Sequence, residues 1–391
     1  MTSPQTLVPE IRFEGFSSAW ERHKLGEFCE ITTGRLDANA MVPDGKYDFY
    51  TSGIAKYKID IPAFSGPAIT IAGNGATVGY MHLADGLFNA YQRTYVLSGF
   101  GADRQYLFYA IGTKLPEKIA QEARTGNIPY IVMDMLTNLD IDIPSMEEQA
   151  LIGECLKKIG SLIVLHRRKQ NQLKNVKKSM LEKMFPRDGA NVPEIRFAGF
   201  TNAWEQRKLS EVADKVTEKN VDLAVHETFT NSAEYGVISQ RDFFDHDISN
   251  AENIGGYYVV RNEDFVYNPR ISVTAPVGPV NRNKLGRNGV MSPLYTVFRT
   301  HDIDTTYLEW FFKSSYWHPF MFFNGDSGAR SDRFSIKDAV FFEMPIPTPS
   351  LAEQRWIGAY MDKLDNLITL HQCKCDKLKD LKNSLLRKMF L

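Results

Sequence analysis

Two long stretches of the chain repeat apolar residues at steps of four and three, the spacing that places side chains on one face of a helix. One stretch begins at Ile143 and its relative begins at Thr348, 205 residues later. The pattern predicts two long helices, over 145–186 and 349–391, that pack against each other along a heptad seam. The predicted seam residues are Ile152, Leu156, Ile159, Ile163, His166, Gln170 and Leu173, and then Ile357, Met361, Leu364, Ile368, His371, Cys375 and Leu378.

Both helices are expected to start at a capping box. Ser145 with Glu148, and Ser350 with Glu353, have the S-x-x-E spacing in which the serine accepts from the third helical amide and the glutamate reaches back. These two motifs predict where each helix begins.

The seam contains one histidine in each copy, His166 and His371, at the same position of the repeat. The pair is interpreted as a polar position that sets the register of the helices, as seam Asn residues do. A pH-sensitive pair or a metal-binding pair is the alternative.

Between the helical stretches the pattern changes to short β-branched and aromatic runs broken by Gly, Asn and Asp, which is typical of strands. The clearest examples cover 69–97 and 264–298, and a helix is predicted after each, over 105–122 and 306–323. The fold class is therefore α+β, with globular domains at 1–144 and 205–348, each placed before a long helix.

A second repeat opens each half. VPEIRFEGFSSAWERHKL starts at Val8, and VPEIRFAGFTNAWEQRKL starts at Val192, with thirteen of eighteen positions identical. The predicted linker segment, 187–204, contains the start of the second copy. The Phe, Trp and Leu residues of the repeat suit an apolar anchor, whereas Glu21 and Lys24 suit a solvated edge. Because the offset grows from 184 to 205 residues, the second variable region is the longer one.

Composition limits the class of protein without choosing the function. The 391 residues are 43% hydrophobic and 24% charged, which suits a globular protein of two or three domains. The net charge is −1, but 157–187 holds ten Lys or Arg against one acidic residue, so the rest of the chain is acidic. Four cysteines, no signal peptide and no long apolar run predict a cytoplasmic protein without a disulfide framework or a membrane span.

Motifs for bond-breaking chemistry are missing. GNGATVG, from Gly73, lacks the spacing and the lysine of phosphate-binding loops and is interpreted as a hairpin turn. YNPR, from Tyr267, lacks the second proline and final aromatic of the adenine methyltransferase motif. Cys373 and Cys375 form a lone CxC, which is a weak metal signal. The sequence therefore predicts a chain with no catalytic residues, no metal and no cofactor.

Arg, Asn and Gln gather instead in turn-rich parts of the globular regions, with Tyr and Phe nearby. Arg side chains match guanine edges and Asn or Gln amides match adenine, so these types suit reading of the major groove. The candidate DNA-binding residues are Asn74, Gln92, Arg93, Arg124, Asn127, Gln240, Arg241, Tyr267, Asn268, Arg270, Arg330 and Arg333.

The doubled VPEIRF…AW…KL word, the two PS-x-x-EQ helices and GNGATVG…NAYQRTYVL together resemble the DNA specificity subunit of type I restriction–modification systems. The resemblance covers essentially the whole chain. It implies two target recognition domains that each read one half of an asymmetric bipartite DNA site. It also implies an antiparallel helix pair that sets the spacer between the halves.

The resemblance further implies a phage-defence complex in a bacterial or archaeal cytoplasm. Two methyltransferase subunits would bind S-adenosylmethionine and methylate one adenine in each half-site. Two restriction subunits would use ATP and Mg to translocate and cut unmodified double-stranded DNA. None of this chemistry would belong to the present chain, and weak DNA binding is expected of the chain alone because its recognition domains are acidic.

Three other interpretations stay open on the sequence. The chain could be the recognition subunit of a combined cleaving and methylating enzyme outside type I, which gene neighbours would distinguish. A two-lobed protein-binding scaffold explains the repeat but not the Arg/Asn-rich turns. A self-sufficient enzyme conflicts with the missing motifs.

Overall fold

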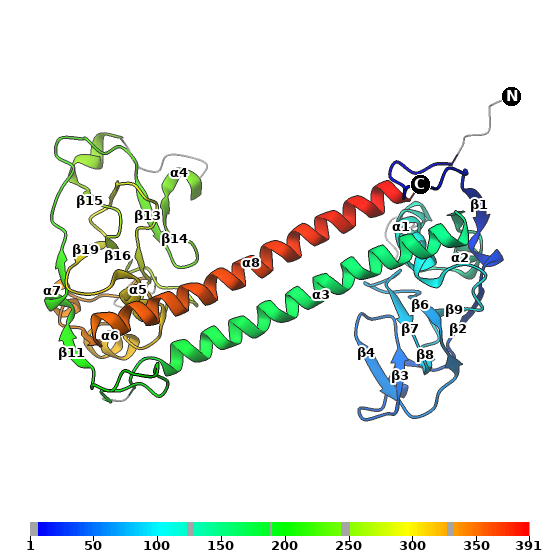
Figure 1. Ribbon diagram of the computed structural model, residues 1–391, viewed down its shortest axis with the longest axis horizontal. Helices are drawn as coiled ribbons and strands as arrows, with labels where there is room; N and C mark the ends of the chain where they lie inside the picture. Colours follow the sequence, from blue (N-terminus) through cyan, green and yellow to red (C-terminus); the bar gives the residue numbers. More distant parts are fainter. Residues whose placement is uncertain (1–6, 123–128, 188–189, 244–250, 327–331, 391) are drawn as a thin grey trace. The chain divides into compact units, whose positions relative to one another are not determined.

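The computed structural model describes residues 7–122, 129–187, 190–243, 251–326 and 332–390 (Figure 1). The chain divides into two compact units. Unit 1 comprises 1–168 and 371–391, and unit 2 comprises 169–370. Each unit therefore takes part of its chain from both halves of the sequence repeat.

Unit 1 contains a four-stranded sheet of order β2-β9-β6-β7, a second of order β4-β3-β8-β5, and the pair β1-β10. Its strands pair antiparallel except for β3 with β8. The strands are β1 (Glu21–Lys24), β2 (Glu30–Thr33), β3 (Tyr47–Tyr50), β4 (Lys56–Ile59), β5 (Phe64–Ser65), β6 (Ala68–Ala72), β7 (Met81–Ala84), β8 (Leu87–Ala90), β9 (Thr94–Ser98) and β10 (Asp140–Ile143).

Unit 2 repeats this plan in part. Its four-stranded sheet has the order β12-β19-β16-β17, and three antiparallel pairs, β13-β14, β15-β18 and β11-β20, complete it. The strands are β11 (Glu205–Lys208), β12 (Ala213–Lys215), β13 (Phe229–Ser232), β14 (Gly236–Ser239), β15 (Tyr258–Val260), β16 (Phe265–Tyr267), β17 (Val280–Arg282), β18 (Gly289–Met291), β19 (Thr296–Thr300) and β20 (Pro345–Thr348).

The helices follow the predicted order with two differences: one predicted helix is broken, and the short helices α2, α4 and α7 were not predicted. The stretch predicted as one helix over 306–323 forms two, α5 and α6. Ser314 ends the first helix by donating its hydroxyl to Phe311 O (2.6 Å), and Pro319 occupies the first turn of the second. The α-helices are α1 (Arg104–Glu122), α2 (Met133–Thr137), α3 (Met146–Lys183), α4 (Gln240–Phe243), α5 (Thr305–Lys313), α6 (His318–Asn324), α7 (Asp338–Phe341) and α8 (Leu351–Met389). Short 3-10 turns occur at Leu25–Glu27, Ala38–Ala40, Leu209–Glu211 and Ala251–Gly256.

The long helices α3 and α8 pack antiparallel within each unit. In unit 1, His166 lies against His371, with 2.9 Å between their Nδ1 atoms, and Cys375 Sγ lies 3.6 Å from Ile163 O. Residue numbers rise along α3 while the numbers of the contacting α8 residues fall, so the two helices are antiparallel. In unit 2, Lys177 of α3 pairs with Asp365 of α8. All fourteen predicted seam side chains are buried or half-buried.

Each unit closes its core with the end of the long helix that starts in the other unit. Met389 and Phe390, at the end of α8, pack in the core of unit 1, where the Phe390 ring stacks on Tyr106. Met184 and Phe185, at the end of α3, occupy the equivalent place in the core of unit 2. The Met-Phe pair that ends each long helix therefore anchors that helix in the core.

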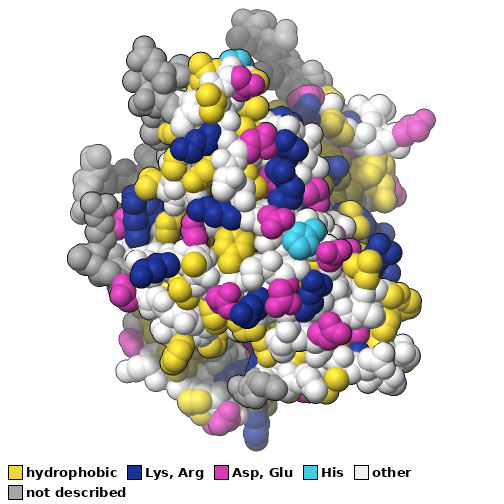
Figure 2. All heavy atoms as spheres, turned by 90° about the vertical axis from the view of Figure 1, so that its left-hand side faces the viewer, with side chains coloured by type: hydrophobic (Ala, Val, Ile, Leu, Met, Phe, Trp, Pro, Cys, Tyr) yellow, Lys and Arg dark blue, Asp and Glu magenta, His cyan; other side chains and the backbone are white. Residues whose placement is uncertain are grey.

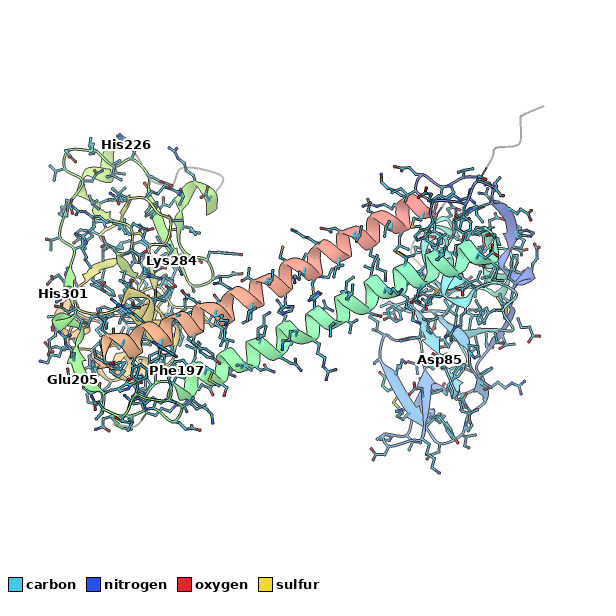
Figure 3. The ribbon with its side chains drawn as sticks, viewed as in Figure 1. Asp85, Phe197, Glu205, His226, Lys284 and His301 are labelled. Atoms are coloured by element: carbon cyan, nitrogen blue, oxygen red, sulfur yellow. The ribbon has the colours of Figure 1, made fainter. Side chains whose placement is uncertain are left out.

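The opening repeat holds the start of each long helix. Arg12 donates two hydrogen bonds to the buried Glu148 carboxylate, both 2.7 Å, and Arg196 binds the buried Glu353 in the same way at 2.6 and 2.7 Å. Beside Arg196, Phe197 packs edge-on against aromatic rings of α8 (Figure 3). The predicted capping boxes are thus half correct.

The two serines do accept from the third amide, at 3.4 and 3.3 Å. The two glutamates bind arginine instead of reaching back. A charged guanidinium offers a buried carboxylate two parallel, charge-assisted bonds, which the cap amide cannot match. As predicted, Trp20 and Leu25 of the repeat are buried, whereas Glu21 and Lys24 are exposed.

Within the described residues, no helix combines the length and apolar character needed to span a membrane.

Candidate nucleic-acid interface

Each unit has a four-stranded sheet, and the two units carry different loops at the same position of these equivalent sheets. Loop 1, residues 73–80, connects β6 to β7, and loop 2, residues 268–279, connects β16 to β17. In both sheets these strands occupy the last two positions, so the loops are topologically equivalent. Each loop also forms an isolated bridge with a later segment, through Asn74 with Tyr130 and through Arg270 with Arg333. The structure thereby brings several predicted DNA-binding residues together in each unit.

Loop 1 is shaped by its first glycine. The Gly73 amide donates to Arg93 O at 2.8 Å, and a Cβ atom on Gly73 would lie only 2.4 Å from that oxygen. Asn74 follows, and its Oδ1 accepts from the Ser52 hydroxyl at 2.7 Å. Tyr130, opposite Asn74, is exposed. GNGATVG is therefore a hairpin turn, as predicted, and its close packing explains its glycines.

A small polar hollow lies beside loop 1, with a volume of about 300 Å³. The exposed side chains of Gln92 and Arg93 stand on its rim, in the turn between β8 and β9. Donors of the two types expected to read bases are thus held next to Asn74. The lining residues are Thr33, Gly73, Gln92, Arg93, Tyr95 and Ile131.

Loop 2 is longer and is tied at its base by side chains. Asn268 Nδ2 donates to Asn231 O (2.7 Å), and Asn268 Oδ1 accepts from the Arg270 amide (3.0 Å). Gly278, at φ +83°, closes the loop where a Cβ atom would lie 2.1 Å from Asn268 O. The Asn268 amide therefore shapes the loop, while the Arg270 side chain remains exposed. Arg333, across the bridge, is half-buried.

Tyr267 is not placed on the surface. It is 3% exposed, its hydroxyl donates to Val277 O at 2.9 Å, and its ring stacks on Phe341. Burial raises the pKa of Tyr267, so the phenol stays neutral. Tyr267 therefore supports loop 2 from inside the core. A ring that is enclosed in this way cannot stack on a base. Phe334, beside Arg333, is also buried.

The remaining candidates do not join either group. Gln240 and Arg241 begin α4, which follows the separate β13-β14 pair, and Gln240 Nε2 donates to Phe229 O at 3.4 Å. Arg124, Asn127 and Arg330 lie outside the described residues.

Charge on unit 2 is mixed rather than segregated on the face that Figure 2 displays. Lys and Arg side chains alternate there with Asp and Glu. Many arginines in this unit are committed to carboxylates, as Arg287 is to Glu227 and Arg299 is to Asp264, with bonds of 2.7–2.8 Å. Phosphate attraction from this face is therefore weak.

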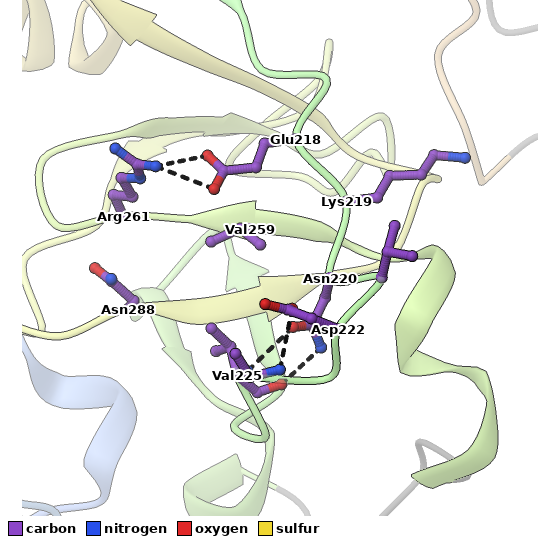
Figure 4. A pocket seen from close by; sticks show the side chains of 10 residues that line it. Glu218, Lys219, Asn220, Asp222, Val225, Val259, Arg261 and Asn288 are labelled. Carbon is purple, nitrogen blue, oxygen red and sulfur yellow. Dashed lines mark hydrogen bonds and ion pairs between the residues drawn. The ribbon is translucent and has the colours of Figure 1, made fainter.

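A hollow of about 540 Å³ in unit 2 is a poorer candidate (Figure 4). Its Glu218 carboxylate already binds Arg261 at 2.9 and 3.0 Å. Its Asn220 side chain bonds both backbone groups of Val225 and so closes its own loop. The polar groups of this hollow serve the local fold.

A second surface, the exposed stripe, repeats on the long helices. Leu151, Leu165 and Val176 of α3 are exposed apolar residues, and the residues 205 positions later on α8 are also apolar and exposed. Steps of 14 and 11 residues return close to one face of a helix. Each unit contains one equivalent set: Leu151, Leu165 and Leu381 in unit 1, and Trp356, Leu370 and Val176 in unit 2.

The arginine pairs and the exposed stripe were missed by reasoning from sequence. Both had a signal, because Arg12 and Glu148 are each identical in the two copies of their repeats. A position that is apolar in both copies but lies off the heptad seam was the corresponding signal for the stripe.

Known proteins resemble the chain over most of its length. A family model described as the type I restriction modification DNA specificity domain matches 17–175 and again 202–380. The type I restriction enzyme EcoDI specificity subunit of Escherichia coli is 37% identical over 137 residues, which cover 35% of this chain and 30% of that protein. The MjaVIII specificity subunit of Methanocaldococcus jannaschii is 22% identical over 394 residues, covering 94% and 91% of the two chains.

The fold also resembles a solved structure. The S subunit of a type I restriction-modification system from M. genitalium aligns with a TM-score of 0.59 at 15% identity, over 98% of this chain and 99% of that one. At this identity the likeness is one of fold.

Proposed function

Because the chain belongs to the family of type I restriction-modification DNA specificity domains, we propose that it reads a bipartite DNA site for partner subunits that methylate and cut. Loop 1 reads one half of the site, and loop 2 reads the other half. The chain itself carries out no bond-making or bond-breaking step.

One observation carries this proposal: the units share a framework but present unlike loops at the same position. Loops 1 and 2 span 8 and 12 residues, and loop 2 carries an arginine and three prolines that loop 1 lacks. Two copies of one framework give each DNA half the same approach, whereas unlike loops allow the two halves to differ in sequence. Two donors, Arg93 in the turn beside loop 1 and Arg270 on loop 2, suit purine edges in the major groove.

The exposed stripe is evidence that the chain binds two copies of one partner protein. Exposed apolar residues that recur on one face of a helix mark a protein-binding surface more often than scattered ones do. Since the stripe occurs once in each unit, the chain offers two equivalent docking places. In this proposal they receive two methyltransferase subunits that bring S-adenosylmethionine. Two restriction subunits bring ATP and Mg, and the complex acts in the cytoplasm.

The antiparallel helix pair is proposed to set the spacer between the half-sites. Its continuous helices, α3 of 38 residues and α8 of 39 residues, cross from one unit to the other. Inserting or deleting whole turns of both helices is expected to change the spacer preferred by the complex. An unchanged spacer would count against this role.

Methylome sequencing of cells that carry the chain with its methyltransferase partner tests the reading function. The wild-type chain is expected to produce adenine methylation at one bipartite motif. Arg270→Ala is expected to relax one half of the motif by about tenfold or more in discrimination at a base. Arg93→Ala is expected to relax only the other half.

Arg261→Ala, an exposed arginine change in unit 2 away from loop 2 and from the exposed stripe, is the matched control and should leave the motif unchanged. Equal losses in both halves after Arg270→Ala would contradict the assignment of loop 2 to one half-site.

A further inference from the structure

Val273 stands at the tip of loop 2 with its side chain fully in solvent, at 102% of its reference exposure. Single exposed apolar residues are common on protein surfaces and need no explanation of their own. What distinguishes Val273 is its place, three residues after the exposed Arg270, on the loop that the proposed function assigns to DNA.

The backbone presents this side chain rigidly. Ser272 N donates to Ala275 O at 3.0 Å, and Ala275 N donates in return to Ser272 O at 3.1 Å. The Ser272 hydroxyl also accepts from Ala275 N, at 3.1 Å. Val273 and Thr274 therefore form a closed two-residue tip. A valine has one side-chain torsion, so holding it against a ligand costs little entropy.

The base of loop 2 prevents the tip from folding back. Ile271 N donates to Asp332 O at 3.0 Å, and Phe334 N donates to Pro269 O at 2.8 Å, which joins the loop to the 332–335 segment on both sides of the Arg270–Arg333 bridge. Asn268 secures the inner end through Asn231. The tip is thus held outward by bonds that do not involve the Val273 side chain.

The chemistry of Val273 selects one kind of base contact. In the major groove, acceptors and donors are read by polar side chains, and the thymine 5-methyl group is the one apolar feature of the base edges. A branched apolar side chain beside an arginine complements that methyl group, while the arginine reaches a purine. Wedges that open base steps are typically larger, such as Phe, Leu or Met.

We propose that Val273 is a specificity-determining residue that contacts the 5-methyl group of one thymine in the half-site read by unit 2. The inference rests on the proposed function, because it requires loop 2 to enter the major groove. Since each half-site is expected to contain the adenine that is methylated, each also contains a thymine on the complementary strand. Removing one methyl group from this contact should weaken binding about fourfold.

The test uses the complete methyltransferase complex and DNA duplexes that carry its motif. Each thymine of the second half-site is replaced in turn by deoxyuridine, which removes only the 5-methyl group. With the wild-type chain, one position is expected to lose about fourfold in binding. With Val273→Ser, which leaves no methyl group at this position, the same replacement should cost nothing, while the uracil response at other positions stays unchanged.

Val221→Ser is the matched control, because Val221 is an exposed valine (79%) on the 540 Å³ hollow of unit 2 and not on loop 2. Variants at Val273 should fold normally, since the side chain touches no neighbour. The inference is overturned if Val273→Ser keeps the wild-type response to uracil at every position. Failure of the proposed function looks different: the wild-type complex would then recognise no bipartite motif at all.

Discussion

The two units share the bonds that hold the start of each long helix, whereas their reading loops differ. Asp103 N donates to Gln149 Oε1 at 2.9 Å in unit 1, and Asp304 N donates to Gln354 Oε1 at 2.8 Å in unit 2. Loop 1 is a short glycine turn, but loop 2 is held by asparagine bonds and ends in an exposed valine. The bonds that are the same in both units and the loops that differ therefore lie in separate parts of the fold.

The comparison teaches where change is tolerated. Buried carboxylates and amides at the helix starts cannot vary without leaving unpaired groups, so they keep both units alike. Loop 1 and loop 2 instead hang from a sheet that does not depend on their tips. A protein built in this way can acquire a new half-site in one unit without disturbing the other unit or the docking of partners.

The largest expected effect follows from breaking the framework. Arg12→Ala in unit 1 or Arg196→Ala in unit 2 leaves Glu148 or Glu353, which are 0% and 1% exposed, without a charged partner. We expect each variant to lose about 3–5 kcal/mol of unfolding free energy, measured by chemical denaturation.

Lys24→Ala, which removes an exposed ion pair with Asp140, is the control and should cost less than about 1 kcal/mol. A large loss from Arg12→Ala with none from Arg196→Ala would show that the frameworks are not equivalent.

The next effect concerns the exposed stripe. Leu165→Asp and Leu370→Asp place a charge at equivalent exposed positions, so folding should be spared while docking of an apolar partner surface is lost. Native mass spectrometry should find one methyltransferase bound to each single variant and none bound to the double variant. We expect an affinity loss of at least about tenfold at the altered place. Retention of two partners by both single variants would remove the stripe as the docking surface. Asn171→Asp, which adds a charge at an exposed position of α3 on another face of the helix, serves as the control.

A smaller effect is expected at the histidine pair of the seam. The 2.9 Å contact between the two Nδ1 atoms requires one ring to donate and the other to accept. Changing His166 and His371 together to Leu should raise stability, on the order of 1 kcal/mol, because apolar seam contacts replace half-buried polar groups. Thermal unfolding measures this, and each single variant should be less stable than the double. A double variant that melts below the wild type would show that the pair stabilises the helices.

The smallest effect concerns the Glu309 carboxyl of unit 2 and its response to acid. Burial acts to raise the pKa of Glu309, but Lys313, Arg282 and Lys284 outweigh it, so the pKa lies below its usual value. A carboxyl with a lowered folded pKa stabilises the fold above its unfolded pKa and loses that stabilisation as pH falls through the folded value. The equivalent position in unit 1 is Phe108. Glu309→Gln should therefore change the acid dependence of hydrogen exchange in unit 2 and leave that of unit 1 unchanged.

Much of the framework was readable from the sequence because it is written twice. The heptad seam, the strand-rich regions and the helix starts all depend on local spacing, which sequence shows directly. The arginines that bind the caps were not predicted, since a bond between residues 136 positions apart has no local pattern. The break between α5 and α6 was missed, although Ser314, Ser315 and Pro319 marked it, because aromatic residues continue on both sides of the break.

The reading surface was predicted less well. Residue types pointed to Asn74, Gln92, Arg93, Arg270 and Arg333, and the structure gathers these around loops 1 and 2. Their contacts with bases remain predictions. Tyr267 looked accessible because it adjoins Asn268, but strand alternation turns its ring into the core. Val273 carried no signal, since exposure of an apolar residue depends on the turn that presents it.

One measurement tests the central claim, that equivalent frameworks carry independent reading loops. In a chimeric chain, the segment 205–348 is replaced by a second copy of 21–143, so that both units present loop 1. Methylome sequencing of this chain with its methyltransferase partner should reveal an interrupted palindrome, in which both halves match the half-site of unit 1. A methylated motif that keeps the wild-type second half would contradict the claim, because reading of that half would then not reside in unit 2.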